Sequence, residues 1–203
     1  MRDARHVMVA VPTRGHLWAG TVARLQKIRD RNPGLPPVLY AVGRTSAEDT
    51  RNLVAEHFLE SDCDVLLSVD DDIIPPYDVL RLVDHIREDE RWGIVGAVYA
   101  LSGEDGLEAA VFDEADPGSG WSWKFAPPGD GLQQHFAVGL GCVAISRSIF
   151  EALDPRPFRL TYDDAHNARI APDHFLCHEI GRLGRRVGVD WSIRAEHYNR
   201  IVI

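Results

Sequence analysis

The sequence predicts an α/β fold, a three-layer α/β/α sandwich with a mostly parallel central sheet. Through the first hundred residues, short apolar runs rich in β-branched residues alternate with segments of helical periodicity. Pro and Gly mark the turns between them. The most apolar run ends directly in Asp70-Asp71-Asp72, and ligands of open α/β sheets bind at the carboxyl ends of strands.

The elements of the first half follow from local signals. A first strand ends at Pro12, and apolar residues at helical spacing then run from Trp18 to Ile28. The next helix starts at Ser46, which forms a capping-box-like pair with Asp49 three residues later. Strands are expected at 6–11, 37–42, 64–69 and 93–100, and a third helix at 78–89.

The second half is less regular. Gly, Pro, Asp and Ser dominate from 102 to 136, which indicates a long loop with ordered pieces only at 107–112 and 121–125. Residues 136–146 then indicate one strand interrupted by glycines. A helical turn is expected at 149–153, a helix at 173–184 with Leu183 facing inward, and a strand at 187–193.

Length and composition narrow the class of protein. A chain of 203 residues fits a single domain, 1–203. No apolar run approaches the roughly 20 residues of a membrane span, so we expect a cytoplasmic protein. A net charge of −9 without a basic stripe argues against a large nucleic-acid footprint. Cys63, Cys142 and Cys177 are odd in number and lie in apolar surroundings, which favours packing over disulfides or zinc.

The aspartate run is the strongest chemical signal. Three carboxylates at one strand end repel one another unless a cation neutralises them. The run resembles the Asp-x-Asp motif of GT-A glycosyltransferases, particularly the family-2 type, where it holds a divalent metal and a nucleotide-sugar diphosphate. Asp70 and Asp72 fill its two positions, and His197 resembles the family's C-terminal metal-binding histidine. The resemblance implies a Rossmann-like GT-A fold with Mn²⁺ or Mg²⁺ on Asp70, Asp72 and His197.

Other short motifs follow in the family's order. Val11-Pro12-Thr13 is similar to the first-strand end that receives the nucleotide, and Thr50-Arg51-Asn52 to a helix motif near it. Gly139-Leu140-Gly141 resembles the segment beneath the donor sugar. The residues that the resemblance places at the donor are Pro12, Thr13, Arg14, Arg51, Asn52, Asp70, Asp71, Gly139 and Gly141.

The segment from Ala171 to Cys177 resembles the part of the family that carries the general base of inverting members. Asp173 occupies the position of the base, whereas Pro172 replaces the usual preceding acid. The first turn of a helix favours a carboxylate, which is an alternative reason for an aspartate there.

The resemblance therefore implies a metal-dependent glycosyltransferase that moves a sugar from a nucleotide-diphosphate sugar, expected to be a UDP-sugar, to an acceptor hydroxyl with inversion. Residues 1–100 would form the nucleotide-binding half and 101–203 the acceptor half. Two alternatives stay open. One is a nucleotidyltransferase on a related sheet, although no Gly-rich phosphate loop follows the first strand. The other is a degenerate, non-catalytic domain that binds sugar nucleotides, which Pro172 favours.

Trp121 and Trp123 flank a serine, so their rings share a face if the segment is a strand. They either cover the core or stack on the acceptor, a saccharide or a hydroxylated base in DNA. The chain has 20 Arg and 2 Lys, which is typical of a GC-rich genome. A bacteriophage enzyme acting in the host cytoplasm would fit both features.

Overall fold

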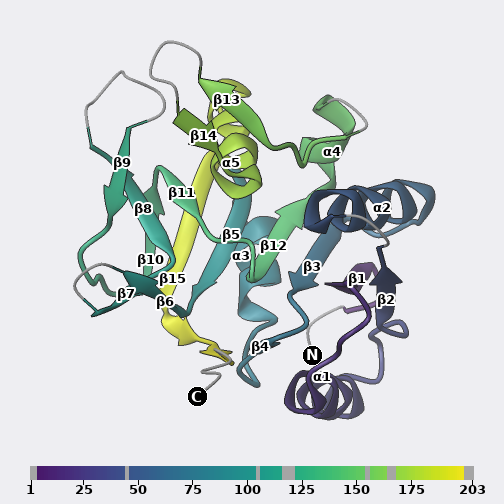
Figure 1. Cartoon of the computed structure of the whole chain (residues 1–203). Helices are drawn as coiled ribbons and strands as arrows, with labels where there is room; N and C mark the ends of the chain where they lie inside the picture. The colour runs from purple at the N-terminus through teal and green to yellow at the C-terminus, as the bar shows by residue number, and fades with distance from the viewer. Residues whose placement is uncertain are drawn as a thin grey trace.

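The structure is a computed structural model that describes residues 4–43, 46–103, 106–115, 122–153, 156–163 and 168–198. A seven-stranded sheet forms its centre (Figure 1). β1 pairs in parallel with β2 and β3, and β5 pairs in parallel with β15. In spatial order the strands are β10 (Leu132–His135), β15 (Arg186–Arg194), β5 (Trp92–Val98), β12 (Cys142–Ser146), β3 (Val65–Val69), β1 (Val7–Thr13) and β2 (Leu39–Val42).

The direction of β12 departs from the alternating pattern. β12 lies between β3 and β5 and runs antiparallel to both, and β10 runs antiparallel to β15 at the sheet edge. The glycine-interrupted run at 136–146 is two strands in different sheets, β11 (Ala137–Val138) and β12. Because of this reversal, Cys142 at the start of β12 pairs with Val69 at the end of β3.

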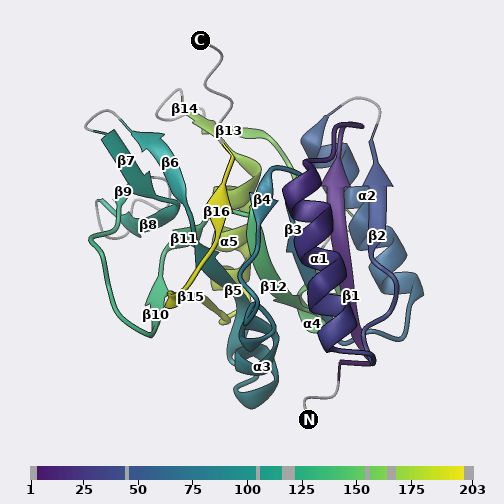
Figure 2. The same cartoon turned by 90° about the horizontal axis from the view of Figure 1, so that it is seen from below.

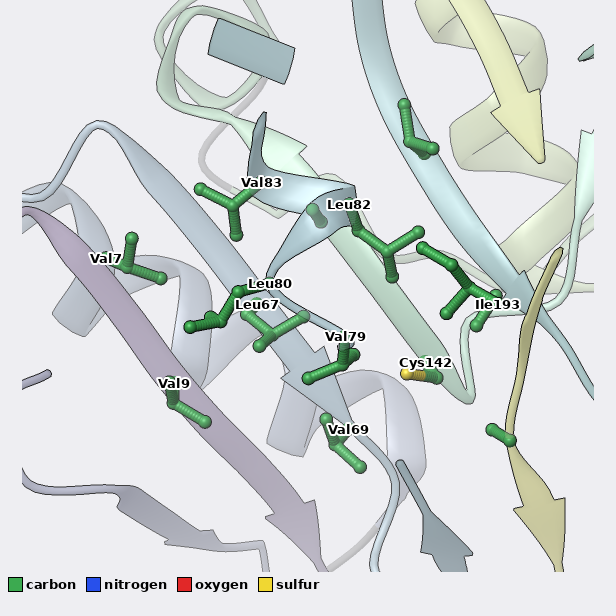
Figure 3. Close-up of a cluster of buried hydrophobic side chains, with 14 of the residues drawn as sticks. Val7, Val9, Leu67, Val69, Val79, Leu80, Leu82, Val83, Cys142 and Ile193 are labelled. Atoms are coloured by element: carbon green, nitrogen blue, oxygen red, sulfur yellow. The ribbon is translucent and has the colours of Figure 1, made fainter. Parts of the chain in front are cut away.

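Helices lie on both faces of the sheet. α1 (Ala19–Arg31) and α3 (Arg81–Glu88) cover one face, and α2 (Ala47–Glu60), α4 (Arg147–Ala152) and α5 (Pro172–Arg182) cover the other (Figures 1 and 2). Each face has its own apolar cluster, since successive strand residues point to opposite sides. Figure 3 shows the cluster beneath α3, where Leu80 lies beside Leu67 of β3 and Leu82 lies beside Ile193 of β15.

The helix ends follow local chemistry. The Ser46 hydroxyl accepts a hydrogen bond from the Asp49 N–H at 3.1 Å, which confirms the predicted cap of α2. Trp18 precedes α1 as its N-cap instead of lying on its inner face. Leu183 was predicted to point inward, and this is wrong: α5 ends at Arg182 and Leu183 is 40% exposed.

Strands at Gly106–Ala109, Val111–Glu114 and Trp123–Phe125 lie close to the ordered pieces predicted at 107–112 and 121–125, whereas the loop predicted around them is wrong at β10. β6 (Ala100–Gly103) and β7 (Gly106–Ala109) make a hairpin, and β8 (Val111–Glu114) pairs with β9 (Trp123–Phe125) and with β11. β7 and β9 are largely exposed and lack the continuous apolar run of a buried strand, so their sequence resembles a loop. Two further pairs are β4 (Ile73–Ile74) with β16 (Glu196–His197), and β13 (Thr161–Asp163) with β14 (Ala168–Ile170).

The cysteines are buried and unpaired, as predicted. Burial raises the pKa of the Cys142 and Cys177 thiols to about 12, so both behave as small apolar residues. Within the described ranges, no helix has the length and apolar character needed to cross a membrane.

Candidate donor and metal site

A pocket opens where β1 and β3 end, because the carboxyl ends of these neighbouring parallel strands meet at one edge of the sheet. Its cavity volume is about 170 Å³. The start of α2 forms a further wall. The lining residues are Pro12, Thr13, Arg14, Ala47, Thr50, Arg51, Asp70, Asp71 and Asp72. The structure thus brings together most of the residues expected at the donor, and adds Ala47 and Thr50.

Arg51 neutralises the first of the three aspartates. Its Nη2 group donates to both carboxylate oxygens of Asp70, each at 2.8 Å. Burial raises the pKa of the Asp70 carboxyl, the charges of Asp72 and Asp71 raise it further, and Arg51 acts in the opposite direction. The ion pair therefore fixes α2 against the end of β3 and keeps a dense cluster of acids in place.

Asp72 faces His197 across the mouth of the site. The pairing of β16 with β4 aligns His197 with Ile73, and the Tyr198 N–H donates to the Asp72 carbonyl at 2.9 Å. His197 Nδ1 lies 2.8 Å from the Ala100 carbonyl, so Nδ1 must carry the hydrogen. In the neutral imidazole, Nε2 then has a lone pair, and it lies 3.5 Å from Asp72 Oδ2.

Two electron-rich atoms facing each other need a proton or a cation between them. A separation of 3.5 Å can be spanned by two ligands that each lie about 2.1 Å from one metal ion. Histidine ligands commonly donate their other ring N–H to a carbonyl, as His197 does. Among the described residues no group of three or more His, Cys, Asp or Glu side chains is arranged around one point. Asp72 and His197 are therefore a facing pair that either a proton or a cation can bridge.

Gly139 and Gly141 lie against a residue that the sequence analysis did not single out, Tyr99. A Cβ atom on Gly139 would come within 2.2 Å of the Tyr99 hydroxyl, and one on Gly141 within 2.7 Å of its ring. The Gly141 N–H donates to the Tyr99 hydroxyl at 3.0 Å, and the Gly141 carbonyl accepts from the Asp70 N–H at 2.8 Å. The glycines thus let Tyr99 reach the acidic loop.

Tyr99 also contacts His197, since its ring meets the His197 ring edge-on with centroids 5.5 Å apart. Burial raises the pKa of the Tyr99 hydroxyl, which stays neutral. Its position just after the apolar run of β5 was the available signal, because residues after buried strands gather at the site.

Asp173 lies in the first turn of α5, where Pro172 is the first helical residue. Burial acts to raise the pKa of the Asp173 carboxyl, but the hydrogen bonds and charge of His174 outweigh burial and lower it. Asp173 lies close enough to Arg51 and Tyr99 for its charge to raise the pKa of both groups. The site therefore has a further carboxylate near Arg51 and Tyr99.

The two tryptophans have different outcomes. Trp123 is 44% exposed and its ring lies 4.5 Å from the ring of His174, the residue after Asp173. Trp121 lies outside the described residues. Trp123 is thus partly exposed and packs on His174, the neighbour of Asp173 in the chain.

Asn52 does not line the pocket at the strand ends. Its side-chain amide donates to the Phe158 carbonyl at 2.9 Å, and its carbonyl oxygen accepts from the Phe158 N–H at 3.0 Å. Both bonds are buried. Asn52 therefore holds the segment that leads to β13 against α2.

Comparisons with known proteins give fold information only. No protein-family model and no curated protein matches the sequence. The fold is similar to A197 from STIV, with a TM-score of 0.66 and 17% identity over 95% of this chain and 85% of A197. It is also similar to GalNAc-T7, whose crystal structure contains UDP, GalNAc and Mn²⁺, with a TM-score of 0.65 and 15% identity. That match covers 97% of this chain but 43% of GalNAc-T7. The chain thus has a GT-A-like fold with a large, mostly parallel central sheet.

Proposed function

We propose that the protein is a metal-dependent glycosyltransferase that moves a sugar from a UDP-sugar to an acceptor hydroxyl. The observation that carries the proposal is the 3.5 Å approach of His197 Nε2 to Asp72 Oδ2, with the tautomer set by Ala100. Asp72 is also one of the three aspartates that, with two arginines, line the pocket at the strand ends. The GT-A-like fold, shared with a protein crystallised with UDP and Mn²⁺, supports the same reading.

In this proposal the pocket of Pro12, Thr13 and Arg14 receives the nucleotide, and Gly139 and Gly141 lie beneath the sugar. Asp72 and His197 hold Mn²⁺ or Mg²⁺, since mixed carboxylate and imidazole ligands suit these ions. The bound cation would supply positive charge next to the diphosphate as it leaves. Asp70 and Asp71 complete the acidic edge, and Arg51 keeps Asp70 oriented through its ion pair.

Asp173 acts as the general base. Its lowered pKa keeps it ionised at neutral pH, so it can accept a proton. As the acceptor oxygen bonds to the anomeric carbon, the bond from that carbon to the UDP oxygen breaks and the hydroxyl proton passes to Asp173. A single displacement of this kind inverts the anomeric configuration.

The proposal is tested by incubating the protein with a panel of nucleotide sugars and measuring release of free UDP with Mn²⁺ and with a chelator. Slow, Mn²⁺-dependent release from one donor is expected in wild type and is lost in Asp72→Asn. Asp78→Asn, an exposed aspartate before α3, is the matched control and keeps activity. Release of diphosphate from a nucleoside triphosphate, with no UDP release from any sugar nucleotide, would instead identify a nucleotidyltransferase.

A further inference from the structure

The hairpin of β13 and β14 presents an exposed face with an aromatic ring beside a cation. Tyr162 pairs directly with Arg169, so the two side chains lie on the same side of the hairpin. Tyr162 is 63% exposed, and Leu160, just before β13, is also exposed. The neighbouring pair places Ile170 on the opposite, buried side. Nothing in the apolar core requires a tyrosine at position 162.

This face borders a groove of about 780 Å³, which we call the arginine groove. Three arginines and two acids line it, whereas two arginines and three aspartates line the donor pocket. The groove is thus a local cationic surface on a chain with a net charge of −9. Its lining residues are Ser46, Glu48, Asp49, Asn52, Arg156, Phe158, Arg159, Leu160 and Arg169.

The arginine groove adjoins the proposed donor pocket through α2. Glu48 lines the groove and Arg51 lines the pocket, one turn apart on the same helix. The Ser46 hydroxyl lowers the pKa of the Glu48 carboxyl, and the charges of Arg51 and Arg169 lower it further, so Arg169 lies within range of the first turn of α2. A chain lying in the groove would pass the donor pocket.

The groove also reaches the N-terminal end of α5. The Arg159 guanidinium lies 5.7 Å from the ring centre of Phe175, two residues after Asp173. The Arg159 Nε donates to the Arg156 carbonyl at 2.9 Å, and Asn52 holds Phe158 by two buried hydrogen bonds. The floor of the groove is therefore anchored to both helices that carry proposed site residues.

We propose that the arginine groove binds a single-stranded nucleic acid, with phosphates at Arg156, Arg159 and Arg169 and a base stacked on Tyr162. Arginines pair with phosphate oxygens through several N–H groups, and an exposed aromatic ring accepts any base by stacking. A sugar ring can also pack on an aromatic face, so the sulfated polysaccharide in the test below separates an anionic saccharide from a nucleic acid. If the proposed function holds, this strand is the acceptor.

The test is fluorescence anisotropy with a labelled single-stranded oligonucleotide of about 10 nucleotides. Wild type is expected to bind, and Tyr162→Ala and Arg169→Ala each to weaken binding about tenfold or more. Tyr162→Phe should retain affinity because the ring is kept. Loss of one phosphate contact in Arg169→Ala should also reduce the slope of log K against log salt by about 0.7, whereas Tyr162→Ala leaves it unchanged. Glu48→Gln should bind more tightly because it removes a negative charge from the groove.

Tyr77→Ala and Arg182→Ala are matched controls, since these exposed residues lie outside the groove. Calorimetry with UDP and Mn²⁺ on the same variants separates this proposal from the donor site, because groove variants should leave UDP affinity unchanged. Failure of wild type to bind the oligonucleotide would overturn the nucleic-acid proposal and leave the donor proposal standing. Unchanged binding in Tyr162→Ala, or equal affinity of wild type for a sulfated polysaccharide, would overturn it as well.

Discussion

The indole ring of Trp18 stacks on the phenol ring of Tyr198, with ring centroids 3.5 Å apart and planes inclined by 19°. The backbone N–H of Trp18 donates to the Asp71 carbonyl at 3.0 Å, and the backbone N–H of Tyr198 donates to the Asp72 carbonyl at 2.9 Å. The stack therefore joins the segment before α1 to the segment that carries His197, across the acidic loop. It holds the two halves of the proposed metal site together.

Trp18→Ala should weaken Mn²⁺ binding in the presence of UDP by about two- to tenfold, because a stacked aromatic pair contributes about 0.5–1.5 kcal/mol beyond its buried area. Calorimetric titration with Mn²⁺ measures this effect, and Trp18→Phe should recover most of the loss. Tyr77→Ala, which removes a ring that packs on Arg24 and Arg31, serves as the control. Equal Mn²⁺ affinity in wild type and Trp18→Ala would show that the stack does not position His197.

Gly139→Ala should destabilise the protein by about 1–3 kcal/mol, because the new methyl group would overlap the Tyr99 hydroxyl. Gly181→Ala on α5 is the matched control: no atom lies within 4 Å of its added methyl group, and the change should stabilise the helix by about 0.5–1 kcal/mol. Urea unfolding gives both values. The double variant Gly139→Ala/Tyr99→Phe should be more stable than the sum of the single effects predicts, since the overlapping hydroxyl is gone. If the two single changes in free energy of unfolding add up to that of the double variant, the methyl group at position 139 does not overlap the Tyr99 hydroxyl.

Asp190 should make stability depend on pH in the acid range. It is 1% exposed and accepts hydrogen bonds from Ser192, from His85 Nε2 at 2.8 Å and from Arg81 at 3.1 Å. Burial acts to raise the pKa of the Asp190 carboxyl, but these bonds outweigh it and lower the pKa. Its ionisation therefore contributes stability above the unfolded-state pKa of about 3.9, which is lost as the pH falls through the lower folded-state value.

Asp190→Asn should thus cost about 1–3 kcal/mol at pH 7, because it removes a charge that accepts hydrogen bonds from His85 and the partly exposed Arg81. The difference from wild type in free energy of unfolding should narrow as the pH falls below about 4. Denaturant unfolding across this range is the measurement. Asp78→Asn, which breaks an exposed ion pair with Arg81, should cost at most about 1 kcal/mol. A difference in free energy of unfolding between wild type and Asp190→Asn that stays constant with pH would show that the ionised Asp190 carboxylate does not stabilise the fold.

Asp173→Asn should lower the rate of sugar transfer by about 10²–10⁴ while UDP affinity persists, because a positioned general base contributes this much. Single-turnover transfer assays and calorimetry with UDP measure the two properties. Glu179→Gln, on the same helix, should leave both unchanged. Transfer at near wild-type rate in Asp173→Asn would place the base elsewhere.

Much of the fold was predictable because its signals are local. Buried parallel strands such as β1 and β3 are continuous apolar runs, and the cap at Ser46 needs only Asp49 three residues away. The direction of β12 was not predictable, since an apolar run carries no information about which way its strand runs. The split at Gly139 depends on Tyr99, which is distant in sequence.

In the candidate site too, local signals predicted some features and missed the contacts between distant residues. Asp70 and Thr13 were expected together because both follow strands that a β-α-β pattern places side by side. The hydrogen bond from His197 to Ala100 and the stack of Trp18 on Tyr198 join residues far apart in the chain. No local sequence pattern predicts either contact. The predicted donor role of Asn52 rested on a three-residue motif, which could not show that Phe158 occupies both ends of its amide.

The central claim is that Asp72 and His197 form a metal site beside a nucleotide pocket. The most direct measurement is calorimetry of UDP binding with and without Mn²⁺ in wild type, Asp72→Ala and His197→Ala, with Asp78→Ala as the control. The proposed site requires Mn²⁺-dependent binding in wild type and in the control, and its loss in both site variants. Mn²⁺-dependent UDP affinity that is unchanged in Asp72→Ala and in His197→Ala would contradict the claim.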